Sequence, residues 1–192
     1  MNRIAVFMGS NIGANRIFTD AAVELGTQLA ARNIGLVYGG GNVGLMGRMA
    51  DAVLHQGGEV IGVIPGFMVD KELAHERASE MIITKSMHER KATMVEKSDA
   101  IIALPGGIGT LEELIEAYTW LQLRIIKHPI GILNTAGYYD PLIRMLDNMV
   151  ENRFLKEIHR NRLVIDDDPA ALLDQMKETS YSFEEKWHIT ES

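Results

Sequence analysis

The chain has 192 residues and a formal net charge of -7, with 46% hydrophobic and 23% charged residues, values typical of one globular domain. The acidic balance argues against a nucleic-acid partner, and cysteine is absent, which excludes disulfides and thiolate metal sites. The six histidines are scattered and no apolar run is long enough for a signal peptide or a membrane span, so we expect a cytoplasmic protein without a metal site.

Strand and helix signals alternate along the whole chain. In chain order the sequence predicts strand 4–8, helix 16–31, strand 36–38, helix 45–55, strands 60–64 and 81–84, helix 87–97, strand 100–104, helix 111–123, strand 130–133, helix 141–150, strand 163–165 and a helix from 169. This order is typical of a doubly wound α/β fold, a mostly parallel sheet with helices on both faces. We predict one domain over residues 1–178 and a C-terminal tail over 179–192.

Three of the predicted strands end in glycine-bearing turns that lead into helices, at residues 9–13, 39–44 and 105–110. The carboxyl ends of parallel strands meet at one edge of a sheet, where such folds bind their ligands. Glycine lets backbone amides approach a phosphate, and a helix N-terminus adds partial positive charge. Glycine is also common in tight strand-to-helix turns, so each turn alone is ambiguous. Three at one edge favour a nucleotide or sugar-phosphate site.

The middle turn matches GxGxxG at Gly39, Gly41 and Gly44, the pattern of dinucleotide-binding folds. That fingerprint needs an acidic residue at the far end of the next strand, and the nearest acid, Glu59, precedes that strand. No GK[ST] follows any of the turns, so the Walker pattern fails as well. The sequence therefore supports neither NAD chemistry nor ATP hydrolysis.

Arg90 and Glu113 each allow two interpretations. Arg90 borders the apolar stripe of its helix and is either a snorkelling arginine or a planar fork aimed at an anion or a sugar oxygen. Thr110 and Glu113 have the spacing of a capping box, and acids are favoured in a first helical turn without any ligand. On this pattern alone, a capping role for Glu113 is favoured over a catalytic one.

Two linked motifs give the chain a specific resemblance. PGGIGTLEE at 105–113 fits the motif PGGxGTxxE, and MHERK at 87–91 fits MHxRK. With the glycines at 39–41 and the opening VFMGS strand, the chain resembles the LONELY GUY (LOG) family over roughly residues 4–176. Members are cytokinin riboside 5′-monophosphate phosphoribohydrolases, often mislabelled as lysine decarboxylases. Nothing in the sequence marks a pyridoxal phosphate site with its Schiff-base lysine.

The resemblance implies a Rossmann-like fold, a homodimer and no cofactor. It also implies hydrolysis of the N-glycosidic bond of nucleoside 5′-monophosphates, typically AMP and N6-prenyl-AMP, to free base and ribose 5-phosphate. By motif position, Arg90 and Glu113 become the catalytic pair. The implied substrate contacts are Ser10, Gly40, Glu72, Arg90, Lys91, Gly106, Gly107, Ile108, Gly109, Thr110, Leu111, Glu112 and Thr119. Ile108 departs from the family pattern, where the position is often aromatic.

Two alternatives stay open. One is a nucleosidase of broader range that acts on other purine or pyrimidine monophosphates. The other is a non-catalytic nucleotide or cofactor carrier of the same fold, because the glycine turns alone would serve binding equally well. A carrier, however, has no need of both Arg90 and Glu113. The sequence leaves the preferred base undetermined.

Overall fold

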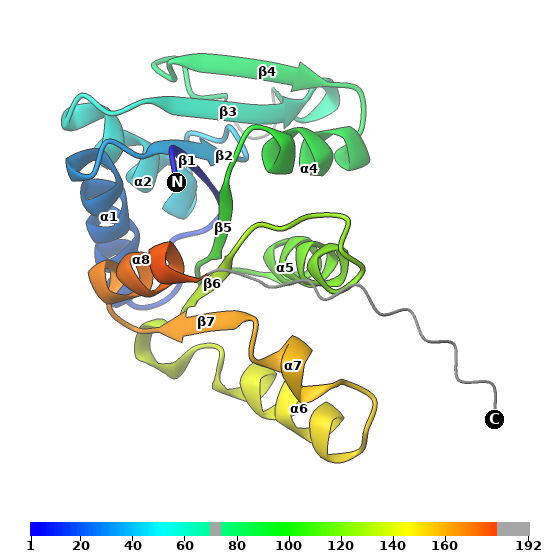
Figure 1. The fold of residues 1–192 in the computed structure, drawn as a ribbon. Coiled ribbons are helices and arrows are strands. Elements are labelled where there is room, and N and C mark those ends of the chain that lie inside the picture. The colour runs from blue at the N-terminus through cyan, green and yellow to red at the C-terminus, as the bar shows by residue number, and fades with distance from the viewer. Residues whose placement is uncertain (70–73, 180–192) are drawn as a thin grey trace.

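The computed structural model describes residues 1–69 and 74–179. Within them, seven strands form one parallel sheet in the order β4-β3-β2-β1-β5-β6-β7 (Figure 1). The predicted doubly wound sheet is confirmed, and it belongs to a single domain. The strands are β1 (Arg3–Phe7), β2 (Gly35–Tyr38), β3 (Val60–Pro65), β4 (Glu80–Thr84), β5 (Ala100–Ala103), β6 (Ile130–Leu133) and β7 (Leu163–Asp166).

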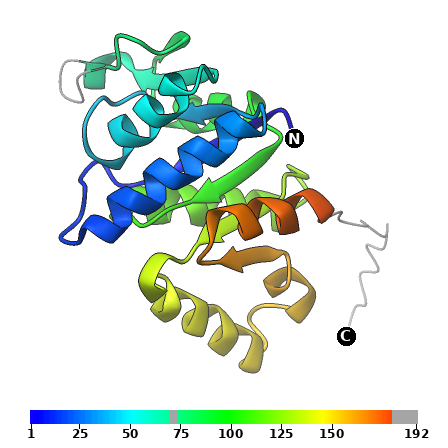
Figure 2. The same cartoon turned by 90° about the vertical axis from the view of Figure 1, so that its left-hand side faces the viewer.

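Helices cover both faces of the sheet. Helix α1 packs against both α2 and α8 on the face turned to the viewer in Figure 2, and α4, α5 and α6 cover the opposite face. None of the described helices is long and apolar enough to cross a membrane. The helical elements are α1 (Arg16–Ala31), α2 (Gly44–His55), η1 (Gly66–Met68), α4 (Met87–Glu96), α5 (Ile108–Gln122), η2 (Thr135–Gly137), α6 (Asp140–Glu151), α7 (Glu157–Arg160) and α8 (Pro169–Glu178).

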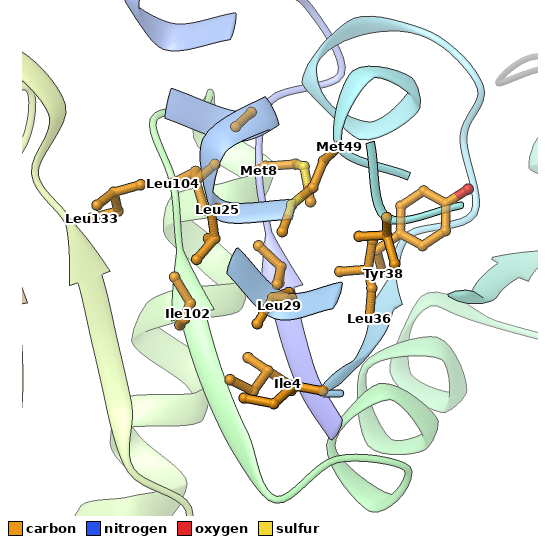
Figure 3. Close-up of a cluster of buried hydrophobic side chains, with 14 of the residues drawn as sticks. Ile4, Met8, Leu25, Leu29, Leu36, Tyr38, Met49, Ile102, Leu104 and Leu133 are labelled. Atoms are coloured by element: carbon orange, nitrogen blue, oxygen red, sulfur yellow. The ribbon is translucent and has the colours of Figure 1, made fainter. Parts of the chain in front are cut away.

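The central strands are apolar on both sides because each side faces a layer of helices. Alternation along β1 sends Ile4 to the α1 face and Ala5 to the α5 face. On the α1 face, Leu25 and Leu29 reach down to Ile4 and to Ile102 of β5 (Figure 3). Each fully buried side chain of this size contributes about 1.5–3 kcal/mol to stability. This core fixes the strand ends from which the glycine turns emerge.

The three glycine turns lie side by side, as predicted. They follow β2, β1 and β5, which are neighbours at the centre of the sheet. Gly9 donates its backbone N–H to the Pro105 carbonyl at 3.2 Å, joining the first turn to the third. The chain winds outward from β1 to β4 and then crosses back to β5, so β1 and β5 flank the topological switch point. In open α/β sheets this crevice is where ligands bind.

Helix α5 begins three residues earlier than predicted. Its N-cap is Gly107, whose carbonyl accepts the Leu111 N–H at 3.1 Å, so Thr110 already lies inside the first turn. The capping box between Thr110 and Glu113 is therefore wrong. The physical reason is that the glycine turn is already helical at Ile108 and leads into the predicted helix without a break.

Candidate active site

A cavity of about 320 Å³ opens at the carboxyl ends of β1 and β2, beside α4 and the N-terminus of α5. Among the described residues, its polar side chains are Ser10, Arg90, Thr110, Glu112 and Glu113. A second hollow of about 360 Å³, lined by the turns after β1 and β5, shares Ser10 and Gly107 with it. The predicted anion site and the predicted catalytic pair therefore line one continuous surface.

Arg90 is held at this cavity by the backbone of β3 and of the turn after β2. Helix α4 begins where Ser86 Oγ accepts the Glu89 N–H at 3.1 Å, and the next residue, Arg90, turns inward and is only 6% exposed. Its Nε donates to the Val63 carbonyl and its Nη2 to the Gly39 carbonyl, both at 3.1 Å. The guanidinium is therefore a buried, oriented fork and not a snorkelling side chain.

Gly39 makes this arrangement possible. A Cβ atom at that position would lie 2.0 Å from Arg90 Nη2, so any side chain there would displace the guanidinium. The sequence singled out Gly40 as a substrate contact, but the structure places Gly39 in the cavity wall. The Gly40 carbonyl instead accepts the His75 N–H at 3.0 Å, which fastens the turn to the chain that follows η1.

Glu113 lies in the second turn of α5, is 9% exposed, and lines the same cavity as Arg90. A buried carboxylate beside a cavity can stabilise positive charge that develops on a bound molecule, because few waters compete with it. The arrangement places one carboxylate and one guanidinium within reach of a common ligand.

The N-terminus of α5 supplies the anion cradle. Gly107, Ile108, Gly109 and Thr110 all line the cavity, and the first backbone N–H groups of a helix have no intrahelical acceptor. Gly107 as N-cap has no side chain that could satisfy them. Gly106 packs so closely on Thr110 that a Cβ there would lie 2.2 Å from the Thr110 hydroxyl. These amides and the hydroxyl form a site suited to a phosphate group.

Lys91 does not line the cavity. Its side chain is 7% exposed and forms ion pairs with Glu112 and with Glu116, the latter at 2.8 Å. Burial alone would lower the pKa of Lys91, but the hydrogen bonds and charges of the two carboxylates raise it above the ordinary value. Lys91 therefore ties α4 to α5 and sets the position of Arg90 relative to Glu113.

Replacing Lys91 with methionine should lower the free energy of unfolding by about 1–3 kcal/mol at pH 7, because two carboxylates lose their buried partner. A raised folded-state pKa stabilises the protein below the ordinary lysine value of 10.5, and that stabilisation disappears as the pH rises through the folded-state value. The difference between wild type and variant should therefore shrink above about pH 10.5 in urea denaturation. Lys97→Met at the exposed end of α4 is the control, and equal destabilisation by both changes would contradict this role.

Two further predicted contacts lie outside the cavity lining. Leu111 is half-buried outside the cavity lining, and Thr119 is exposed, with its hydroxyl donating to the Ile115 carbonyl at 2.7 Å. Glu72 lies outside the described residues. The sequence missed Gly39 and the cavity methionines, Met8, Met46, Met68, Met87 and Met94. Met8 and Gly39 each directly follow a strand, and that position was the available signal.

This fold and this cavity define an α/β protein in which a cavity at the switch point of the sheet is lined by a buried arginine and a buried glutamate. A family model described as "Possible lysine decarboxylase" matches residues 46–176. A probable cytokinin riboside 5′-monophosphate phosphoribohydrolase of Oryza sativa subsp. japonica is 46% identical over 97% of this chain and 79% of its own length. A cytokinin riboside 5′-monophosphate phosphoribohydrolase of Arabidopsis thaliana is 50% identical over 84% of this chain and 76% of its own. The chain belongs to the LOG family, whose curated members are phosphoribohydrolases, enzymes of the glycosidase type.

Solved structures share the fold at much lower sequence identity. The molybdenum cofactor carrier protein of Chlamydomonas reinhardtii superposes with a TM-score of 0.67 at 22% identity, over 92% of this chain and 98% of its own. The molybdenum cofactor binding protein of Rippkaea orientalis superposes with a TM-score of 0.66 at 23% identity, over 91% of this chain and 94% of its own. At this identity the likeness concerns the fold alone.

Proposed function

We propose that this protein hydrolyses the N-glycosidic bond of purine nucleoside 5′-monophosphates, AMP and N6-prenyl-AMP among them, to free base and ribose 5-phosphate. The observation that carries the proposal is the joint placement of Arg90, Glu113 and the α5 amides around one cavity. Relatives that match most of this chain at 46–50% identity are named for this reaction on cytokinin riboside 5′-monophosphates.

The cradle accounts for the phosphate end of the substrate. The 5′-phosphate binds the amides of residues 107–110 and the Thr110 hydroxyl, and this grip supplies binding energy remote from the reacting carbon. It positions C1′ beside Glu113 and converts the attack of water into a step within one complex.

Glu113 acts on the ribose. Cleavage passes through a sugar with oxocarbenium character, whose positive charge a neighbouring carboxylate stabilises. Glu113 also orients the attacking water and accepts its proton as the oxygen bonds to C1′. The bond from C1′ to the base nitrogen breaks, the base takes the bonding electrons, and its protonation balances the proton that Glu113 removes.

Arg90 holds the ribose. Its Nε and Nη2 are oriented by the Val63 and Gly39 carbonyls, so the guanidinium plane has a fixed direction at the cavity. From there it binds ribose hydroxyls or the Glu113 carboxylate, and it keeps the sugar aligned with the carboxylate.

AMP should be hydrolysed and adenosine should not, because adenosine lacks the phosphate that the α5 amides bind. Chromatography of each reaction for released adenine gives the readout, with ribose 5-phosphate measured as the second product of AMP. Turnover of adenosine at the rate of AMP would contradict the proposed role of the cradle. AMP binding without any release of adenine would favour a carrier over an enzyme.

A decarboxylase reading fits Lys91 poorly. A Schiff-base lysine attacks as the neutral amine, whereas two carboxylates keep the Lys91 ammonium charged. A homodimer remains a prediction from the resemblance, and a cytoplasmic location remains a prediction from the lack of a long apolar run in the sequence.

A further inference from the structure

The cavity that contains Arg90 and Glu113 has a wall of methionines. Five of the eleven methionines of the chain line it. They come from four separate segments, namely the end of β1, α2, η1 and α4, so their meeting is a property of the fold and not of a local sequence run. We call this set the methionine wall: Met8, Met46, Met68, Met87 and Met94.

Core packing accounts for only part of the wall. Met8, Met46 and Met94 are at most 5% exposed and belong to the hydrophobic core, where methionine often fills gaps. Met68 and Met87 are half-buried and belong to neither core cluster. Both side chains line the cavity, and packing in the two core clusters gives no reason for them.

The wall adjoins the arginine that we place on the ribose. The Met87 sulfur lies 3.9 Å from Arg90 Nη1. The Met46 sulfur lies 3.0 Å from the position that a Cβ of Gly39 would take, beside Arg90 Nη2. A ribose held by Arg90 would thus carry its base next to thioether groups.

The polar groups of the cavity are already assigned to the sugar-phosphate end. Thr110, Arg90 and Glu113 serve the phosphate and ribose, and Glu112 pairs with Lys91. Ser10 lies at the glycine turn after β1. In the described lining, this leaves the region of the wall without an Asn, Gln, Asp, His or Tyr side chain that could read the edge of a base.

We propose that the methionine wall binds the base of the substrate and selects it by shape and polarisability, not by hydrogen bonds to the 6-position of the purine. Thioethers contact aromatic rings favourably and adapt to different outlines. This inference rests on the proposed hydrolysis of nucleoside monophosphates and specifies its substrate class. Purine 5′-monophosphates that carry an amino, oxo or small substituted amino group at the 6-position are all substrates.

A shape-selective pocket discriminates weakly. Hydrophobic pockets separate close analogues by roughly 10- to 200-fold, whereas a site built to hydrogen-bond one group rejects its analogue by 10⁴ or more. We therefore expect kcat/KM values for AMP, IMP and N6-methyl-AMP that lie within about 200-fold of one another. AMP and IMP are the sharpest pair, because a hydrogen-bond donor is replaced by an acceptor at nearly constant size. A larger ratio between these two overturns the inference while leaving AMP hydrolysis itself intact.

Oxidation footprinting tests contact with the base without relying on turnover. In the Glu113→Gln protein, saturating AMP should slow the peroxide oxidation of Met68 and Met87, as followed by peptide mass spectrometry. Ribose 5-phosphate, which lacks the base, should protect them much less. Met145 on α6 is 51% exposed and outside the cavity, so it serves as the internal reference.

The same experiment separates the two proposals. Failure of AMP to bind this variant in calorimetry counts against the proposed function. Binding of AMP without protection of Met68 and Met87, or with equal protection by ribose 5-phosphate, overturns the methionine wall alone. Selective protection by AMP supports both.

Discussion

Replacing Glu113 with glutamine should lower kcat for AMP by about two or more orders of magnitude while AMP still binds. The amide keeps the shape of the side chain but can neither accept a proton from water nor stabilise an oxocarbenium charge. Because the N-cap of α5 is Gly107, the loss cannot be attributed to a missing helix cap. Single-turnover release of adenine measures the chemical step, and calorimetry measures AMP affinity.

Glu116→Gln is the matched control for Glu113→Gln. Glu116 lies on the same helix, pairs with Lys91 at 2.8 Å and does not line the cavity. Its replacement should change stability modestly and leave kcat within a few-fold of wild type. A Glu113→Gln protein that retains more than about a tenth of the wild-type kcat would show that the carboxylate only shapes the site.

Replacing Arg90 with lysine should lower kcat/KM for AMP by about two orders of magnitude, the scale of losing one oriented donor in an active site. Lysine keeps the charge, but it lacks the planar guanidinium that donates to the Val63 and Gly39 carbonyls at the same time. The ammonium then has no fixed direction toward the ribose. We expect most of the loss in kcat, with the phosphate cradle still binding AMP.

Arg160→Lys is the control for this change, since the half-buried Arg160 pairs with Asp147 at 2.7 Å and does not line the cavity. The Arg160→Lys change should leave kcat/KM for AMP nearly unchanged. Thermal unfolding of both variants separates lost activity from lost fold. Activity of Arg90→Lys equal to wild type, at a temperature where both are folded, would mean that charge alone suffices at this position.

The elements of the fold were predictable because each has a local cause. Buried strands such as Ile130–Leu133 are continuous apolar runs, and α1 begins and ends where its periodicity does. The meeting of three glycine turns followed from strand direction alone. The start of α5 was missed because Thr110 and Glu113 have capping-box spacing, and spacing does not reveal that Ile108 and Gly109 are already helical.

The sequence predicted which motifs meet at the site, but not the direction in which each side chain points. Arg90 and Lys91 are adjacent in one motif, yet successive helical residues point about 100° apart, so one reaches the cavity and the other lies between two helices. Likewise, which of Gly39 and Gly40 faces the cavity depends on how β2 ends. The methionines converge from distant segments, which no local pattern encodes.

The way in which Arg90 is anchored has a consequence for how this chain can evolve. Both of its identified oxygen acceptors are main-chain carbonyls, which no amino-acid replacement can delete. The side chain of Val63 can therefore drift among residues that fit the core without redirecting the guanidinium. The position most sensitive to replacement is instead Gly39, where even the Cβ of alanine would collide with the Arg90 guanidinium. A site anchored in this way tolerates sequence divergence around it and depends on a single position that tolerates almost none.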